Sequence, residues 1–282
     1  MPDAKSIVNK AIPRLYGFYF NALSLLSRKR GAALALKVFS VPRKGRLSKL
    51  QESYLDTARK QKIAFEDGLI QLYHWKGDGD TILLFHGWES NAWRWKYLIE
   101  PLQEKGYNII AIDAPAHGAS DGEQFTAVKY SKVITTVIEL YEPQIVIAHS
   151  VGAMATVYQE SQHQHKFINK LVLLGSPNRL EVIFKGYQQL VGFNSKVYQE
   201  LDNLLKSLYG FHIEEFETAT FARDIKTPAL LIHSPADVIV PIDSLQPIAE
   251  ALENSETFVS ETGGHSLHTP EVVSRIIAFL EN

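Results

Sequence analysis

A serine that could act as a nucleophile stands at Ser150, between two small residues. Ala148 precedes it by two positions and Gly152 follows it by two. The apolar run Gln144–Ala148 predicts a strand before this serine, and Val151–Gln162 predicts a helix after it. At a sharp strand-to-helix turn the hydroxyl stands clear of the backbone, and small neighbours let the strand and the helix approach closely. This spacing suits nucleophilic catalysis, although a structural turn can have the same pattern.

A serine hydroxyl needs a general base, and the base needs an orienting carboxylate, before the serine can attack near neutral pH. Asp237 follows the apolar run Ala229–His233, and His265 follows the run Thr257–Glu261. The carboxyl ends of parallel strands share one edge of a sheet, so these side chains and Ser150 are expected to meet there. We predict His265 as the base and Asp237 as its partner, although either residue alone would suit a polar turn.

An oxyanion that forms during acyl transfer needs backbone N–H donors. The apolar run Thr81–Phe85 leads into His86-Gly87-Trp88, which is expected at the same sheet edge. We predict the amides of Trp88 and Val151 as the oxyanion donors. The Trp88 side chain would then either belong to the core or form a wall of the acyl pocket.

Two other histidines compete with His265 for the role of base. His268 lies three positions further along, but the pair Gly263-Gly264 suits a sharply turning loop that presents His265. His149 precedes the nucleophile directly, and its side chain is expected to point away from the site. We therefore prefer His265 as the base, which gives the chain order Ser150, Asp237, His265.

The sequence predicts no metal and no cofactor. His163 and His165 lie in the tail of a predicted helix and lack the carboxylate partners expected of zinc ligands. The chain contains no cysteine, which excludes disulfides, thiolate ligands and a cysteine nucleophile. It also has no glycine-rich phosphate motif.

The elements that must position these residues alternate between strand and helix patterns from about residue 63. Such alternation is typical of a mostly parallel sheet covered by helices on both faces. A hairpin is expected around Leu69–Trp75. The further predicted strands are Thr81–Phe85, Asn108–Ile112, Gln144–Ala148, Lys170–Leu174, Ala229–His233 and Thr257–Glu261. The predicted helices are Ala92–Lys105, Ala127–Tyr141, Val151–Gln162 and Pro270–Leu280.

Residues 178–226 interrupt this alternation with helical runs at Leu180–Val191 and Lys196–Tyr209. An inserted helical cap is the simplest interpretation. Its apolar side chains would either line a substrate pocket or form the core of the cap. They are Phe184, Tyr187, Leu190, Phe193, Tyr198 and Tyr209.

The charge is divided unevenly along the 282 residues. Residues 1–62 hold 14 basic and 3 acidic side chains, whereas residues 63–282 hold 15 basic and 28 acidic ones. We therefore expect a basic helical extension over 1–62, followed by an α/β domain over 63–282. The extension would rest on an anionic membrane or pack against its own acidic domain.

The apolar runs of the extension are shorter than the roughly 18 residues of a spanning helix, and a secretory signal fits poorly. Both observations favour the cytoplasm. Nucleic-acid binding is not expected, because the domain itself is acidic.

Several of these motifs together resemble the α/β-hydrolase superfamily. They are Leu84–Trp88, Asp113–Ser120, Ala148–Gly152 and the pair Asp237 and His265. The resemblance covers residues 63–282 and implies a three-layer α/β-hydrolase fold, with a mostly parallel eight-stranded sheet and a cap after the sixth strand. Ala148 departs from the glycine that is usual at this position. Asp113 and His117 belong to a loop that is generally structural in this superfamily.

The resemblance implies a serine hydrolase that cleaves a carboxylic ester, or a related acyl bond, of a small-molecule substrate through an acyl-enzyme. One alternative is a lipid or thioester hydrolase that works at a membrane surface. Another is a binding module that keeps the fold without catalysis. Acyl chain length, the choice between ester and thioester, and oligomeric state stay open at this stage.

Overall fold

The computed structural model describes residues 4–66 and 68–282. It divides into two compact units. The larger unit consists of Pro42–Asn178 and Thr218–Asn282, and the smaller one of Met1–Val41 and Arg179–Glu217. Within the described ranges, no helix combines the length and the apolar character that a membrane crossing requires.

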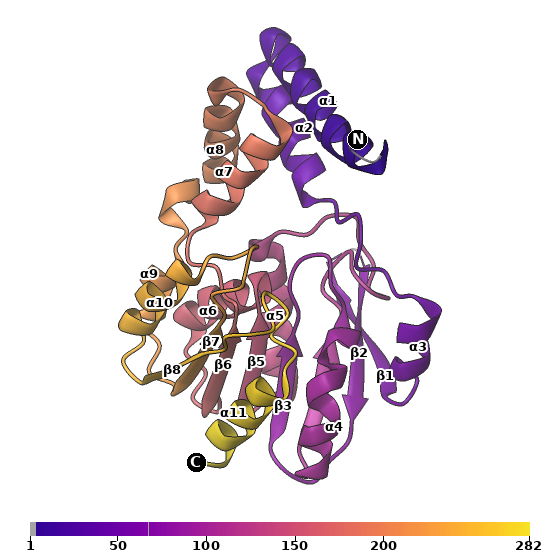
Figure 1. The fold of residues 1–282 in the computed structure, drawn as a ribbon, viewed down its shortest axis with the longest axis vertical. Coiled ribbons are helices and arrows are strands. Elements are labelled where there is room, and N and C mark those ends of the chain that lie inside the picture. The colour runs from indigo at the N-terminus through magenta and orange to yellow at the C-terminus, as the bar shows by residue number, and fades with distance from the viewer. Residues whose placement is uncertain (1–3, 67) are drawn as a thin grey trace. The chain divides into compact units, whose positions relative to one another are not determined.

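An eight-stranded sheet forms the centre of the larger unit (Figure 1). Its strands follow the order β1-β2-β4-β3-β5-β6-β7-β8. β1 and β2 are antiparallel to their neighbours, and the strands from β4 to β8 in this order are parallel. The strands are β1 (Arg59–Phe65), β2 (Gly68–Trp75), β3 (Thr81–Phe85), β4 (Asn108–Ile112), β5 (Ile145–His149), β6 (Lys170–Leu174), β7 (Ala229–His233) and β8 (Ser255–Val259).

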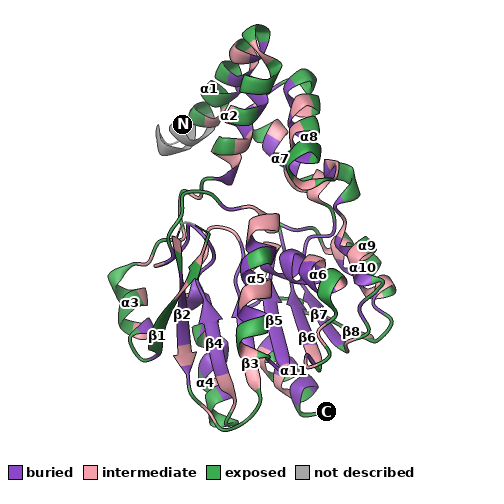
Figure 2. Ribbon diagram, turned by 180° about the vertical axis from the view of Figure 1, so that it is seen from behind, coloured by how far each residue is buried: buried purple, intermediate pink, exposed green. Residues whose placement is uncertain are grey.

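Helices cover both faces of this sheet, which makes three layers. The described helices of this unit are α3 (Lys49–Leu55), α4 (Lys96–Glu104), α5 (Ala127–Tyr141), α6 (Val151–His163), α9 (Thr218–Ala222), α10 (Leu245–Ala251) and α11 (Pro270–Glu281), with short 3-10 turns at Ala92–Trp95 and Ile242–Ser244. Alternate residues of β3 enter two separate cores: Leu83 and Phe85 pack with α5 and α6, and Ile82 and Leu84 pack with α4 and α11. The central strands β3 to β7 are therefore almost continuously apolar and appear buried in Figure 2.

The register brings the carboxyl ends of the parallel strands to one edge. Ala148 of β5 lies opposite Phe85 of β3 and Leu173 of β6. His233, the last residue of β7, lies opposite Val259, the last residue of β8. Loops that follow these strands therefore start at the same level, which is the requirement for the candidate site.

β1 departs from the sequence-based expectation. The basic run Arg59-Lys60-Gln61-Lys62 belongs to the segment expected to be helical, but it lies in an exposed edge strand. Exposed lysines on an edge strand oppose pairing with another chain, which explains why this composition is compatible with a strand. The sheet thus begins before residue 63, and the structure divides its units between Val41 and Pro42 instead of after residue 62.

The smaller unit is helical and joins the N-terminal segment to the insertion. Its helices are α1 (Ala4–Leu26), α2 (Arg28–Ser40), α7 (Leu180–Val191) and α8 (Ser195–Tyr209), with a 3-10 turn at Ile213–Glu215. Phe20, Ala32 and Ala35 from the first pair share a core with Phe184 and Tyr187 from the second. The Tyr187 hydroxyl also donates a hydrogen bond to the Ala35 carbonyl at 3.0 Å.

Most of the apolar side chains predicted in the cap belong to this core. Phe184, Tyr187 and Phe193 are buried, and Tyr198 and Tyr209 pack against them. Leu190 is exposed. Most aromatic side chains of the insertion therefore pack in a core shared with α1 and α2.

Candidate active site

Ser150 occupies the turn between β5 and α6 with a positive φ angle, φ 55° and ψ −127°. A non-glycine residue in this conformation is strained, and strain of this kind concentrates at functional sites. The Ser150 N–H donates to the Leu174 carbonyl at 2.8 Å, which ties the turn to the end of β6. This is the sharp strand-to-helix turn expected from the sequence.

Three small residues make this turn sterically feasible. A Cβ atom on Gly152 would lie 2.5 Å from the His86 carbonyl oxygen, so only glycine fits there. A Cβ atom on Gly87 would lie 2.8 Å from the Cβ of Ser150. Ala148 is fully buried in β5, where its methyl group is accommodated. The departure from glycine at position 148 therefore leaves the turn intact.

The structure brings Ser150, His265 and Asp237 into one hydrogen-bonded chain. The Nε2 of His265 lies 3.0 Å from the Ser150 Oγ, and its Nδ1 lies 2.7 Å from the Asp237 Oδ2. Asp237 has a fully buried side chain, and its Oδ1 accepts hydrogen bonds from the backbone N–H groups of Ile239 and Val240. Because Asp237 accepts at Nδ1, that nitrogen carries the proton and Nε2 is left free to accept one from the serine.

The His265 loop is held by contacts that the sequence did not indicate. The Nε2 of His149 lies 2.7 Å from the His265 carbonyl oxygen and donates to it. The expectation that His149 points away from the site is therefore wrong: the end of β5 lies directly beneath this loop. Burial lowers the pKa of His149 well below its usual range, so the ring stays neutral. The buried Arg94 donates to the Ser266 carbonyl at 3.1 Å and supports the same loop.

His268, the competing imidazole, lies outside the hydrogen-bonded chain. Its ring centroid is 4.1 Å from that of Tyr97. Burial, followed by the charge of Arg94, lowers the pKa of His268 to about 4. The glycines that precede His265 both have positive φ angles, 92° for Gly263 and 51° for Gly264, as the predicted sharp turn requires.

The loop after β3 lies against Ser150. His86 is fully buried; its Nδ1 donates to the Gly87 carbonyl at 2.7 Å, and its Nε2 accepts from the Ala114 N–H at 2.9 Å. This pair of bonds fixes the path of the backbone from Gly87 into Trp88. The Trp88 ring packs near His117 and Phe125, with centroid distances of 5.7 Å and 5.5 Å.

Asp113 and His117 support this loop from behind. Asp113 is fully buried and accepts hydrogen bonds from the Ala92 N–H, the Ala119 N–H and the Tyr73 hydroxyl. Burial raises the pKa of Asp113 to about 6. His117 accepts from the Glu89 N–H at 2.9 Å, and burial lowers its pKa to about 4. Both side chains thus bind backbone groups within the loops, which is a structural role.

Comparisons with known proteins show that the chain is similar to α/β-hydrolases. A family model described as alpha/beta hydrolase fold matches residues 80–201. The non-heme haloperoxidase of Rhodococcus erythropolis is 23% identical over 276 residues, covering 78% of this chain and 99% of the relative. The pimeloyl-(acyl-carrier protein) methyl ester esterase of Vibrio vulnificus (strain YJ016) is 20% identical over 235 residues, covering 68% and 91%. Among solved structures, an esterase of Pyrococcus furiosus has a TM-score of 0.65 at 22% identity, covering 86% of this chain and 97% of its own.

Proposed function

We propose that this chain, which belongs to the α/β-hydrolase superfamily, is a serine hydrolase that cleaves a carboxylic ester or a related acyl bond. One observation carries the proposal: the continuous hydrogen-bonded chain from Asp237 through His265 to Ser150. The esterase activity named for the Vibrio relative supports the ester over other bonds. The haloperoxidase name of the Rhodococcus relative makes bond specificity the point to test.

The proposed reaction begins when the Nε2 of His265 removes the proton from Ser150 and the serine oxygen attacks the acyl carbonyl carbon. Asp237 stabilises the imidazolium that forms. The backbone amides of Trp88 and Val151 are proposed to bind the oxyanion, because Gly87 lies against Ser150 and Val151 begins α6. His265 then protonates the leaving alcohol, and a water molecule activated by the same imidazole releases the acid.

An activity screen tests this proposal against the alternatives. Purified protein is incubated with p-nitrophenyl esters of increasing acyl length and with a matched acyl thioester. We expect ester hydrolysis that disappears in Ser150→Ala and persists in Ser161→Ala, a serine on the same helix that bonds only to a local carbonyl. Turnover of the thioester alone would redirect the proposal to thioesters. A folded wild-type protein without any turnover would support a non-catalytic binding module.

A second candidate is the same chemistry at an anionic membrane surface, and the exposed side of α1 favours it. Leu15, Phe18, Leu25 and Leu26 are 67%, 75%, 84% and 88% exposed. Their spacing places them on one side of the helix, opposite the buried Phe20. A helix with an apolar side facing solvent is typical of segments that lie in a membrane interface.

Basic residues next to this apolar side favour anionic lipid. Arg28, Lys29 and Arg30 are exposed directly after α1, and Arg14 is exposed within it. Negatively charged lipids of the cytoplasmic leaflet attract such segments by about 1 kcal/mol per basic residue. We therefore propose that α1 rests on the cytoplasmic face of a membrane and brings the hydrolase to acyl lipids.

Vesicle co-sedimentation of the full chain tests the membrane candidate. We expect binding to phosphatidylcholine vesicles that contain phosphatidylserine, weaker binding at high salt, and loss of binding in Phe18→Ser/Leu25→Ser. Leu208→Ser removes an exposed leucine from α8 and serves as the control. Absence of wild-type binding at low salt, or equal binding by the α1 variant, would contradict the membrane proposal. The exposed apolar side of α1 would then be expected to contact a protein.

A further inference from the structure

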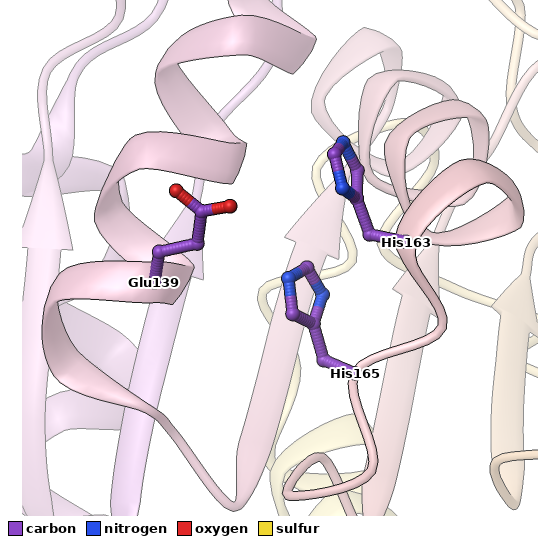
Figure 3. Close-up of side chains that lie close together, drawn as sticks. All are labelled: Glu139, His163 and His165. Carbon is purple, nitrogen blue, oxygen red and sulfur yellow. The ribbon is translucent and has the colours of Figure 1, made fainter.

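A group of metal-ligand side chains lies at the end of α6 remote from Ser150. Glu139 of α5, His163 at the end of α6 and His165 just after it each offer a ligand atom, and these atoms lie within 4.8 Å of one another. Figure 3 shows the three side chains facing one another across the space between the two helices. Because α6 rises about 1.5 Å per residue, roughly 20 Å of helix separates this group from Ser150.

His165 is held by a buried carboxylate. Its Nδ1 lies 2.9 Å from the Glu160 Oε2, and its backbone N–H donates to the Glu160 Oε1 at 2.6 Å. The Glu160 side chain is only 2% exposed, and Gln159 donates a further hydrogen bond to it. A carboxylate that binds one ring nitrogen of histidine fixes the ring and leaves the other nitrogen free, as it does around metal ions.

This finding corrects the expectation that His163 and His165 lack carboxylate partners. Glu160 comes from the preceding turn of α6, and Glu139 comes from the neighbouring helix α5. In the described part of the chain, no lysine or arginine forms an ion pair with Glu139. The packing of α5 against α6 therefore places a second carboxylate, Glu139, next to the two histidines.

The electrostatic environment favours a cation. α5 ends at Tyr141 and α6 ends at His163, so each contributes the negative end of its helix dipole close to the group. The two histidine rings are already stacked, with centroids 5.4 Å apart and planes 17° apart. Both histidines remain close enough to share one ion.

The donor set indicates which cation would bind. Two imidazoles and one carboxylate suit zinc, whereas calcium and magnesium prefer oxygen ligands alone. Zinc ligands at roughly 2.0–2.2 Å from the metal lie about 3.3–3.6 Å apart in a tetrahedron, so the group must contract by roughly 1 Å. Glu139 and His163 are exposed and can move toward the fixed His165.

We propose that Glu139, His163 and His165 bind one zinc-type divalent cation that links the carboxyl ends of α5 and α6. The remaining coordination position is open to water or to an exogenous ligand. The ion would stabilise the fold at this end of the sheet, at a distance from the Ser150 site.

Calorimetric titration of the full chain with zinc chloride, after removal of bound metal with a chelator, tests this proposal. We expect one saturable site, a rise in melting temperature of a few degrees, and no comparable binding of magnesium or calcium. Cobalt chloride provides a second readout, because a tetrahedral site produces intense visible absorption bands.

Two single variants locate the site. His163→Ala and Glu139→Gln change exposed side chains, and each is expected to weaken zinc binding at least tenfold and to abolish the cobalt bands. His212→Ala removes a histidine that pairs with Asp202 in the smaller unit, and it should bind zinc like the wild type. Unchanged zinc binding in both site variants, or no saturable binding by the wild type, would overturn the proposal.

Discussion

The Nε2 of His265 lies 3.0 Å from the Oγ of Ser150, although 115 positions separate the two residues in the sequence. The contact exists because the loops after β5 and β8 leave the same edge of the sheet. In the proposed reaction each residue depends on the other, since a serine hydroxyl needs a base to become nucleophilic near neutral pH. The predictions below follow from this contact and from the residues that hold it.

Asp237→Asn should impair catalysis while preserving the fold. An amide would stabilise the wrong tautomer of His265, so we expect kcat to fall by roughly 10³–10⁴-fold. The matched control is Asp243→Asn, which changes an exposed carboxylate in the next turn of chain. Steady-state kinetics with the best ester measures the loss of catalysis in each variant, and thermal melting shows whether the fold is preserved. A kcat within threefold of the wild type in Asp237→Asn would remove this carboxylate from the mechanism.

Gly87→Ala should reduce activity more than stability. The new methyl group would lie 2.8 Å from the Ser150 Cβ and 3.3 Å from its Oγ, which forces the nucleophile or the loop to shift. A misplacement of about 1 Å costs on the order of 100-fold in rate.

Gly186→Ala in α7 is the control for Gly87→Ala, because a methyl group there meets no heavy atom within 4 Å. It should leave kcat/KM unchanged and stabilise the helix by about 0.5–1 kcal/mol. Equal kcat/KM values in Gly87→Ala and the wild type would show that the loop does not touch the reacting groups.

His117→Gln should make stability less sensitive to acid. The pKa of His117 is lowered from 6.5 to about 4 by burial, so its contribution is present above pH 6.5 and is lost as the pH falls toward 4. Between pH 7 and pH 5 this amounts to roughly 2 kcal/mol.

Urea unfolding at pH 7, 6 and 5 measures this difference between His117→Gln and the wild type. Asp113, whose raised pKa of about 6 acts in the opposite direction, is present in both proteins and cancels. If both proteins lose stability equally over this range, His117 is not held neutral by the fold.

The sequence was sufficient for the elements that position the site. The strands β3, β4, β6 and β7 coincide with the predicted runs, because each is a short apolar segment bounded by polar or turn residues. The order of Ser150, Asp237 and His265 followed from the strands that precede them. These features depend on local patterns, which a single sequence displays directly.

Contacts between distant elements were not visible in the same way. The bond between His149 and the His265 carbonyl depends on the height at which β5 ends beneath a loop more than a hundred residues later. The approach of Glu139 to His163 depends on how α5 packs against α6. The basic run Arg59–Lys62 in β1 was not recognised as a strand, because it is exposed throughout and lacks the alternation of a half-buried strand.

The most direct measurement is labelling by a fluorophosphonate probe, followed by peptide mass spectrometry. We predict that the wild-type protein gains one phosphonyl group, located on Ser150, and that Ser150→Ala gains none while Ser161→Ala is labelled like the wild type. An unlabelled but folded wild-type protein, or a label that persists in Ser150→Ala, would contradict the assignment of Ser150 as the nucleophile.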